Sequence, residues 1–374
     1  MKAYRSTVAL SFALSLLGLL TVSAIVPCDT ASADERIASR KQLLDEGYLP
    51  VQTHAAALRL PPAPVAIPAH SLPWPIKFQD SQHTLGNVMA QYQPFGDPYF
   101  HGGIDIRTVG GWPVHTPVAG RLEAGHYGYA TNPDGSMTKM WKPWPSDGDA
   151  TYFEVGIVMK DGTRFEFHHM NHDTLPKEIV AALNKGNVTV PAGTLLGSPI
   201  SWIGEDYDHI HYNIITPEGI RINPEYASTL IKDTLAPEVS AKLAVMSDGL
   251  TVRDFGDGVF TESPKEFVFE VVDHQDGNIY DHPPALSKLR FDSGQETVWD
   301  FRSSLTGADG KFPNLFQFVL ESIAGPGGQL QTTGGYGTGK SLVRLKVPTG
   351  AKGKFSITFA DQAGNTGVSN GEIR

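Results

Sequence analysis

The sequence predicts a mainly β protein in which two β-rich parts follow each other along the chain. Between about residues 72 and 230, short β-type runs are separated by glycine, as in Val118-Ala119-Gly120-Arg121-Leu122. From Asp233 onward, apolar and polar residues alternate strictly, which is typical of a β-sandwich. The chain of 374 residues is long enough for each part to enclose its own core.

The first part contains further runs with the composition of short strands, each bounded by turn residues. They lie at 153–159, 163–167, 188–190 and 209–215. Residues 128–149 are rich in Asn, Pro, Gly and Asp, so we expect a long loop there. Trp141 and Trp144 are expected to anchor it by packing, and substrate contact is the alternative.

The second part, residues 233–374, shows its alternation in three segments. Each segment places its apolar residues on one strand face, which predicts a separate sandwich core. The three sets are Phe267, Phe269 and Val271; Val343, Leu345 and Val347; and Phe355, Ile357 and Phe359.

Residues 1–33 have the pattern of a secretory signal peptide. Lys2 and Arg5 precede an apolar run over 8–26, and Ala31-Ser32-Ala33 forms a small-residue cleavage site. Because the run is long for a signal peptide, an uncleaved N-terminal anchor is the alternative. Both interpretations export the rest of the chain to the periplasm, the cell envelope or the extracellular space.

Residues 34–71 are rich in proline and are interpreted as a tether. No later segment approaches the roughly 20 apolar residues that a spanning helix needs, so we expect no stable membrane insertion after signal cleavage. Cys28 is the single cysteine and precedes the expected cut, which excludes disulfides and thiolate zinc ligands from the mature chain. The net charge of −10 makes nucleic acid a poor partner.

Two short motifs carry the chemistry, His101-Gly102-Gly103-Ile104-Asp105 and His209-Ile210-His211. Two imidazoles and one carboxylate give a metal three protein ligands and leave a fourth position for water, as in catalytic zinc sites. If residues 208–215 form a strand, His209 and His211 face one side, and Ile210, Tyr212 and Ile214 face the other. The motifs together indicate a zinc hydrolase.

With a third motif between them, these segments resemble the lysostaphin-type, or LytM-like, zinc metallopeptidases. Members of that family carry H-x-x-x-D, then a Y-x-H-L-like segment, then H-x-H, and this chain matches them in that order over 72–230. The resemblance implies a mainly antiparallel β core of the duplicated hybrid motif type and peptidoglycan endopeptidase activity. The third motif is Phe167-His168-His169-Met170, and flanking matches include Phe95-Gly96, Pro117-Val118-Ala119-Gly120 and Ile222-Asn223-Pro224.

Residue by residue, the resemblance implies that His101, Asp105 and His211 bind Zn²⁺. His209 then acts as the general base toward the zinc-activated water, and His169 stabilises the negative charge that develops on the carbonyl oxygen. His168 is the rival of His169. Because neighbouring strand residues face opposite sides, we expect one of the pair in the groove and choose His169, although a bulge would reverse the choice.

The chain departs from the family before the last motif, where the family has a loop rich in glycine, threonine and serine. The residues here are Ser201-Trp202-Ile203-Gly204-Glu205-Asp206-Tyr207-Asp208. This acidic run is expected either to attract a substrate amine or to support His209 from outside the metal site.

The expected function is an exported zinc metalloendopeptidase that hydrolyses peptide cross-links of bacterial peptidoglycan. The alternative is a non-catalytic LytM-like protein that binds the wall or activates another cell-wall hydrolase, with wall-associated protein partners. A third interpretation is a wall-associated adhesin with the sandwich as its working part. That sandwich, 233–374, opens with Asp233-Thr234-Leu235-Ala236-Pro237 and resembles bacterial immunoglobulin-like domains.

Acidic residues beside glycines in the second part raise the question of calcium. Ordinary turns use the same residues, and their spacing matches no known calcium-loop signature. Turns are therefore the preferred interpretation of Asp254, Asp257, Asp273 and Asp276.

Overall fold

The computed structural model describes residues 67–77, 84–93, 99–131, 137–201, 207–305, 319–320, 322–324, 330–332 and 341–374. The expected signal peptide and most of the expected tether lie outside these residues. In the described part of the chain, no helix combines the length and the apolar character needed to cross a membrane. Nearly all strand pairs are antiparallel, so the prediction of a mainly β, antiparallel chain is confirmed.

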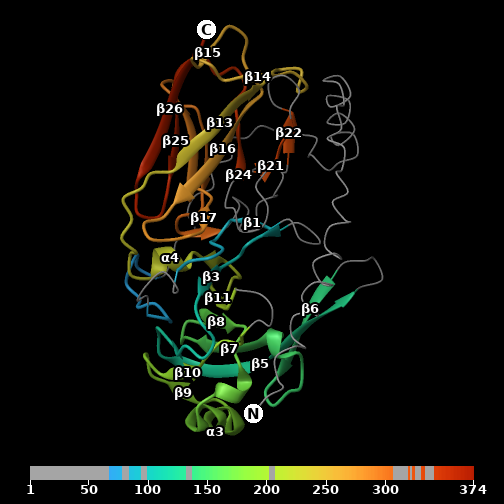
Figure 1. Ribbon diagram of the computed structural model, residues 1–374, viewed down its shortest axis with the longest axis vertical. Coiled ribbons are helices and arrows are strands. Elements are labelled where there is room, and N and C mark those ends of the chain that lie inside the picture. The colour runs from blue at the N-terminus through green and yellow to red at the C-terminus, as the bar shows by residue number, and fades with distance from the viewer. Residues whose placement is uncertain are drawn as a thin grey trace, which may run out of the picture.

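One nine-stranded sheet forms the first part of the molecule (Figure 1). Its strands are β3 (Ile104–Arg107), β5 (Gly120–Thr131), β6 (Met137–Pro143), β7 (Phe153–Val158), β8 (Arg164–His168), β9 (Thr189–Val190), β11 (His209–Ile215), β12 (Arg221–Ile222) and β20 (Ser304–Leu305). Their order is β20-β12-β11-β8-β7-β5-β6, with β3 paired to β11 and β9 paired to β5. The smaller elements are β1 (Tyr92–Gln93) with β2 (Tyr99–Phe100), β4 (Val114–His115) with β10 (Leu195–Gly197), the 3₁₀ turns η1 (Ala150–Tyr152) and η2 (His172–Thr174), and the helices α3 (Lys177–Lys185) and α4 (Pro224–Ala227).

Strand β11 forms because its residues alternate between an apolar core face and a polar face. Ile210, Tyr212 and Ile214 are fully buried in the core of the first part, as the alternation predicts. His209 and His211 lie on the opposite face. The hydrophobic pattern thus fixes the register of the strand and, with it, the direction of both histidines.

The expected long loop at 128–149 is largely a β-hairpin. Strand β5 continues to Thr131 and pairs with β6 from Gly125↔Pro143 to Thr131↔Met137. The polar composition indicated a loop, but cross-strand pairing gives this segment its structure. Trp144 packs on the core as expected and donates from Nε1 to Asn184 Oδ1 at 2.8 Å, whereas Trp141 is exposed.

The second part is a two-sheet sandwich that lies end to end with the first (Figure 1). One sheet contains β13 (Glu238–Val245), β14 (Val252–Asp254), β16 (Glu266–His274), β17 (Asp281–His282), β21 (Val319–Leu320) and β24 (Ser341–Lys346). The other contains β15 (Val259–Phe260), β18 (Leu286–Phe291), β19 (Glu296–Asp300), β25 (Gly353–Ala360) and β26 (Thr366–Ile373), and β22 (Ser322–Ala324) pairs with β23 (Leu330–Thr332). The apolar residues singled out by alternation fill the core between the two sheets, except Val347, which follows β24 and packs against this core partly buried.

The two parts are joined by contacts that the sequence did not indicate. Strand β20 comes from the second part and pairs with β12 at the edge of the first sheet. Met89 and Ala90 belong to the core cluster of the sandwich. Asn278 donates to the Leu85 carbonyl at 2.9 Å, and His282 Nε2 lies 3.0 Å from the Gly86 carbonyl. The sandwich therefore braces the segment 85–90, which borders the histidine face of the sheet.

Candidate metal centre

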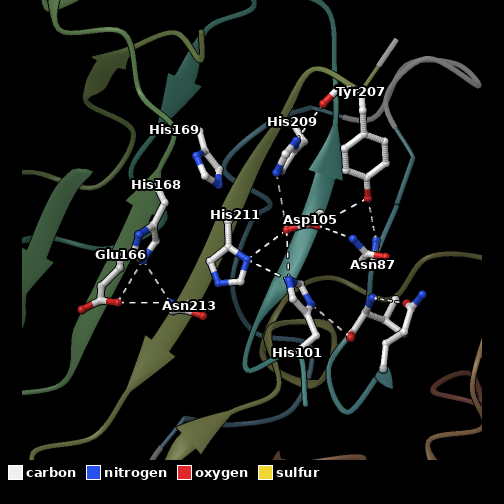
Figure 2. A network of polar contacts seen from close by, with 12 residues as sticks. Asn87, His101, Asp105, Glu166, His168, His169, Tyr207, His209, His211 and Asn213 are labelled. Atoms are coloured by element: carbon white, nitrogen blue, oxygen red, sulfur yellow. Dashed lines mark hydrogen bonds and ion pairs between the residues drawn. The ribbon is translucent and has the colours of Figure 1, made fainter. Parts of the chain in front are cut away.

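Three adjacent strands align the histidine motifs on one face of the sheet. His211 in β11 lies directly opposite Asp105 in β3 and, on the other side, opposite His168 in β8. Cross-strand partners point to the same face, so these side chains converge (Figure 2). His101 lies just before the start of β3, and its side chain extends toward Asp105 and His211.

His101, Asp105 and His211 each contribute one side-chain atom to a compact group. His101 Nε2 lies 3.1 Å from Asp105 Oδ1 and 2.9 Å from His211 Nδ1. His211 Nδ1 lies 2.9 Å from the same Asp105 oxygen. These separations are close to the roughly 3.3 Å between ligands of a tetrahedral zinc ion with bonds of about 2.0–2.1 Å.

Gly103 is required by the close approach of β11 to the first motif. A Cβ atom at this position would lie 2.4 Å from the Tyr212 carbonyl oxygen and 2.1 Å from Asn213 Oδ1. Because the first of these atoms is backbone, any side chain here would push β11 away from His101 and Asp105.

Neighbouring groups orient the three converging side chains. The Val88 carbonyl lies 3.2 Å from His101 Nδ1 and accepts its proton, which leaves the Nε2 lone pair for the centre. Asn87 donates from Nδ2 to Asp105 Oδ2 at 2.7 Å, and the Tyr207 hydroxyl lies 3.4 Å from the same oxygen. With Oδ2 occupied in this way, Oδ1 is the carboxylate oxygen that faces the two histidines.

The protonation states of Asp105 and His211 suit metal ligation. Burial alone raises the pKa of Asp105, but the neighbouring His101 and His209 and its hydrogen bonds hold that pKa well below the ordinary value. Burial lowers the pKa of His211 to about 3. At neutral pH the centre therefore offers an ionised carboxylate and a neutral imidazole, the forms that bind metals.

The donor set fits zinc. Two imidazole nitrogens and one carboxylate oxygen are ligands that Zn²⁺ accepts, and a single cation would satisfy all three facing atoms. In the described part of the chain, this group supplies three ligands, which is the number in catalytic zinc sites that keep a position open.

His209 lies beside the centre with one ring nitrogen fixed. Its Nδ1 lies 2.7 Å from the Tyr207 carbonyl, to which it donates, so Nε2 presents a lone pair. That Nε2 is 3.9 Å from Asp105 Oδ1. A neutral imidazole in this position can accept a proton from a molecule held at the centre.

His169 lies across from His209, with a distance of 4.8 Å between the two ring centroids. Its Nδ1 donates to the Thr151 carbonyl at 2.7 Å, so Nε2 is the ring nitrogen turned away from that carbonyl. To donate from Nε2 to a negative oxygen, the ring must carry a second proton. Burial lowers the pKa of His169 well below its ordinary value, and negative charge that develops nearby would favour binding of this second proton.

His168 lies on the same face as His211, with ring centroids 5.1 Å apart, but among carboxylates. Its Nε2 is 3.1 Å from Glu166 Oε2, and its Nδ1 is 3.1 Å from Glu154 Oε2. These carboxylates also bind Arg164, at 2.7 Å for Glu154 and 2.8 Å for Glu166. Because a guanidinium already compensates this cluster, we assign no metal to it.

The sequence-based choice assumed that strand alternation places His168 and His169 on opposite faces. The structure does not follow this rule. β8 ends at His168, and His169 adopts a left-handed backbone conformation with φ of 60°. Both rings therefore lie near His211, at 5.1 Å and 6.5 Å between ring centroids. The two rings differ in their neighbours. His168 lies among carboxylates, whereas His169 lies beside His209.

The acidic segment before β11 is described only at its ends, because 202–206 lie outside the described residues. Tyr207, the first described residue after this gap, supports His209 through its backbone carbonyl. Asp208 Oδ2 accepts from the Gly110 amide at 2.8 Å, and its backbone carbonyl accepts from Arg107.

Sequence reasoning missed Asn87 and Tyr207, which lie outside the three motifs and reach Asp105 only through the fold. Asn213 also faces this side, and its Nδ2 lies 3.2 Å from Glu166 Oε2. The period-2 pattern of β11 could have identified Asn213, since it follows His209 and His211 on the same face.

We expect Asn87→Ala to lower the zinc affinity by about 10- to 100-fold, because Asp105 loses the donor that orients its carboxylate. Competition with a chromophoric chelator measures the change, and Asn184→Ala, on helix α3, is the matched control. An unchanged affinity in Asn87→Ala would show that other contacts suffice to orient Asp105.

We expect His169→Ala and His168→Ala to separate catalysis from stability. His169→Ala should bind zinc and turn over slowly, because it removes a ring that faces the groove. His168→Ala should lower the free energy of unfolding by about 1–3 kcal/mol, because buried polar partners lose a contact. Turnover and thermal melts check both. Normal turnover in His169→Ala with an inactive, folded His168→Ala would reverse the assignment.

No protein-family model and no curated protein matches the chain. Among solved structures, it is similar to the catalytic domain of the prophage-encoded M23 protein EnpA from Enterococcus faecalis, with 19% identity, 40% of this chain and 95% of that chain covered, and a TM-score of 0.25. It is also similar to the antimicrobial peptidase lysostaphin from Staphylococcus simulans, with 12% identity, 78% and 95% covered, and a TM-score of 0.27. Likeness at these scores carries no argument, so the proposal below depends on the motifs and the geometry of the site.

Proposed function

We propose that this chain is an exported, lysostaphin-type zinc metalloendopeptidase that hydrolyses peptide cross-links of peptidoglycan. The observation that carries the proposal is the convergence of His101, Asp105 and His211 beside two further histidines, His209 and His169, whose Nδ1 atoms are fixed by backbone carbonyls. A purely structural metal site needs neither of those two rings.

In the proposed hydrolysis, the metal and the two further histidines have separate roles. When bound, zinc supplies Lewis-acid chemistry, which brings the pKa of a water molecule toward neutrality and polarises a peptide carbonyl. His209 Nε2 accepts the proton of the attacking water, since its Nδ1 proton is committed to Tyr207. His169, across from His209, would stabilise the negative charge on the carbonyl oxygen by donating from Nε2 once its ring has taken a second proton from solvent water.

The substrate class follows from the three ordered motifs and their resemblance to the lysostaphin-type family. The expected signal peptide at 1–33 supports a site of action outside the cytoplasm. We include in the proposal the assignment of 233–374 as an immunoglobulin-like domain; its two-sheet architecture supports that assignment. Its role would be to position the metal-bearing part on the wall.

The test is digestion of purified cell-wall sacculi by the zinc-loaded chain, with the released fragments identified by mass spectrometry. We expect soluble fragments that carry newly formed peptide termini. Bound zinc without released fragments would instead support the non-catalytic wall-binding or activator alternative. Wall binding with neither zinc nor hydrolysis would support the adhesin interpretation.

A further inference from the structure

A second group of acidic side chains lies outside the histidine centre, at the junction of the two parts. It consists of Asp233, in the segment between α4 and β13, Asp273 near the end of β16, and Asp361 just after β25. One carboxylate oxygen from each lies within 4.8 Å of the other two. Asp273 and Asp361 are buried, with 6% and 3% of their surface exposed.

Asp273 gives an independent sign that a ligand belongs here. Its Oδ1 atom is buried and has no hydrogen-bond partner in the described part of the chain. The side chain lines a cleft that Asp233 and Asp361 also line. A buried carboxylate oxygen without a donor is costly unless a cation or a proton satisfies it.

The other two carboxylates are held in place by backbone amides. Asp361 Oδ1 accepts from Gly364 and Asn365 at 2.6 and 2.9 Å. Asp233 Oδ1 accepts from Leu235 and Asp276, both at 3.1 Å. These bonds orient the carboxylates but bring no cationic side chain into the group.

The remaining titratable groups that line the cleft do not compensate the charge. Glu225 in α4 adds a fourth carboxylate, and burial together with Asp361 and Asp233 raises its pKa to about 8. Burial and the same carboxylates, with Glu225, also raise the pKa of Asp273 to about 8. His282 is the basic group in the lining, but burial lowers its pKa to about 4, so it is neutral at pH 7.

We propose that Asp233, Asp273 and Asp361 bind a calcium ion, with Glu225 as a further carboxylate at the same cleft. Calcium prefers oxygen ligands at about 2.3–2.6 Å, so ligands on opposite sides of the ion lie up to about 5 Å apart. The facing oxygens, each within 4.8 Å of the other two, lie inside this limit, and calcium accepts a site built of several carboxylates whereas magnesium usually keeps several waters. The ion would link the segment that contains Asp233 to the ends of strands β16 and β25 of the sandwich. This place lies beside α4 of the first part.

Calcium titration of the full chain, freed of metal by a chelator, tests the site by calorimetry and by thermal unfolding. We expect one calcium per chain and a higher unfolding midpoint in calcium than in chelator. Asp273→Asn should weaken calcium binding by roughly tenfold or more, because it removes a charged ligand. In chelator it should unfold at or above the wild-type midpoint, because no bound ion is lost and the amide takes one carboxyl group out of the acidic cluster.

Two controls separate this site from other effects. Asp292→Asn removes an exposed carboxylate of the same sandwich and should respond to calcium as the wild type does. His211→Ala disables the histidine centre and should keep the full calcium response, so failure of the zinc proposal does not affect this test. If Asp273→Asn is destabilised in chelator, Asp233→Asn provides the same comparison.

The proposal is overturned if the wild type gives no calcium-dependent shift or if Asp273→Asn and Asp233→Asn keep it. Loss of the response in His211→Ala would place the calcium at the histidine centre. An equal response to magnesium would remove the assignment to calcium.

Discussion

His211→Ala is expected to release zinc and to reduce hydrolysis by more than the 10²- to 10⁴-fold typical of a lost general base. His211 Nδ1 is 2.9 Å from both Asp105 Oδ1 and His101 Nε2, so its removal leaves two of the three facing ligands. Catalytic zinc sites in proteins use three protein ligands. Elemental analysis of the purified variant, together with release of fragments from sacculi, measures both losses.

The matched control for this variant is His172→Ala. It also removes one imidazole from the first part, but His172 is 41% exposed and pairs with Asp173. The control should retain zinc and activity, and circular dichroism should show that both variants are folded. If folded His211→Ala still holds a full equivalent of zinc, His211 is not a ligand, and the proposed centre is wrong.

The strand that carries the second motif could be predicted because a single pattern determines both its fold and its chemistry. Burial of Ile210, Tyr212 and Ile214 forces His209 and His211 to the opposite face. The sandwich core could be predicted for the same reason, since strict alternation over several residues is typical of strands with one buried face.

The groups that orient the centre could not be predicted, because they are brought together by long-range pairing. Asn87 contacts Asp105 across 18 residues of sequence, and Tyr207 reaches the same carboxylate across 102. Neither residue belongs to a short motif. Their partners are defined only once β3 has paired with β11.

Alternation also failed to distinguish His168 from His169, for a physical reason. The rule holds only within a strand, and β8 ends at the first of the two residues. His169 follows in a left-handed conformation, and its ring still lies near those of His209 and His211. A left-handed conformation at a single residue after a strand does not alter the hydrophobic pattern, so the sequence could not reveal it.

The contacts between the two parts were invisible to sequence patterns as well. Each core satisfies its own periodicity, yet Met89 and Ala90 pack into the sandwich core and β20 pairs with the first sheet. Tyr280 of the sandwich and Tyr207 both contact the guanidinium of Arg107, at 5.1 and 4.3 Å from the ring centroids. The sandwich thus adjoins the groups that support Asp105.

His209→Ala is expected to keep one equivalent of zinc and to lose about 10²- to 10⁴-fold in turnover. His209 Nε2 lies 3.9 Å from Asp105 Oδ1, outside the triangle formed by the three ligand atoms, and its Nδ1 is committed to the Tyr207 carbonyl. The ring is thus placed to accept a proton and is not needed to hold the metal. Zinc content and the hydrolysis rate of a soluble peptide, measured on the same preparation, test the separation.

His209→Gln is the size-matched companion, because it fills similar space but cannot act as a base near neutral pH. If His209→Ala loses turnover because the site collapses, His209→Gln should recover turnover. If His209→Ala loses turnover because the base is missing, His209→Gln should be equally slow. Loss of zinc in both variants would make His209 a ligand. His169 would then become the candidate for the base, because its Nδ1 is fixed in the same way by the Thr151 carbonyl.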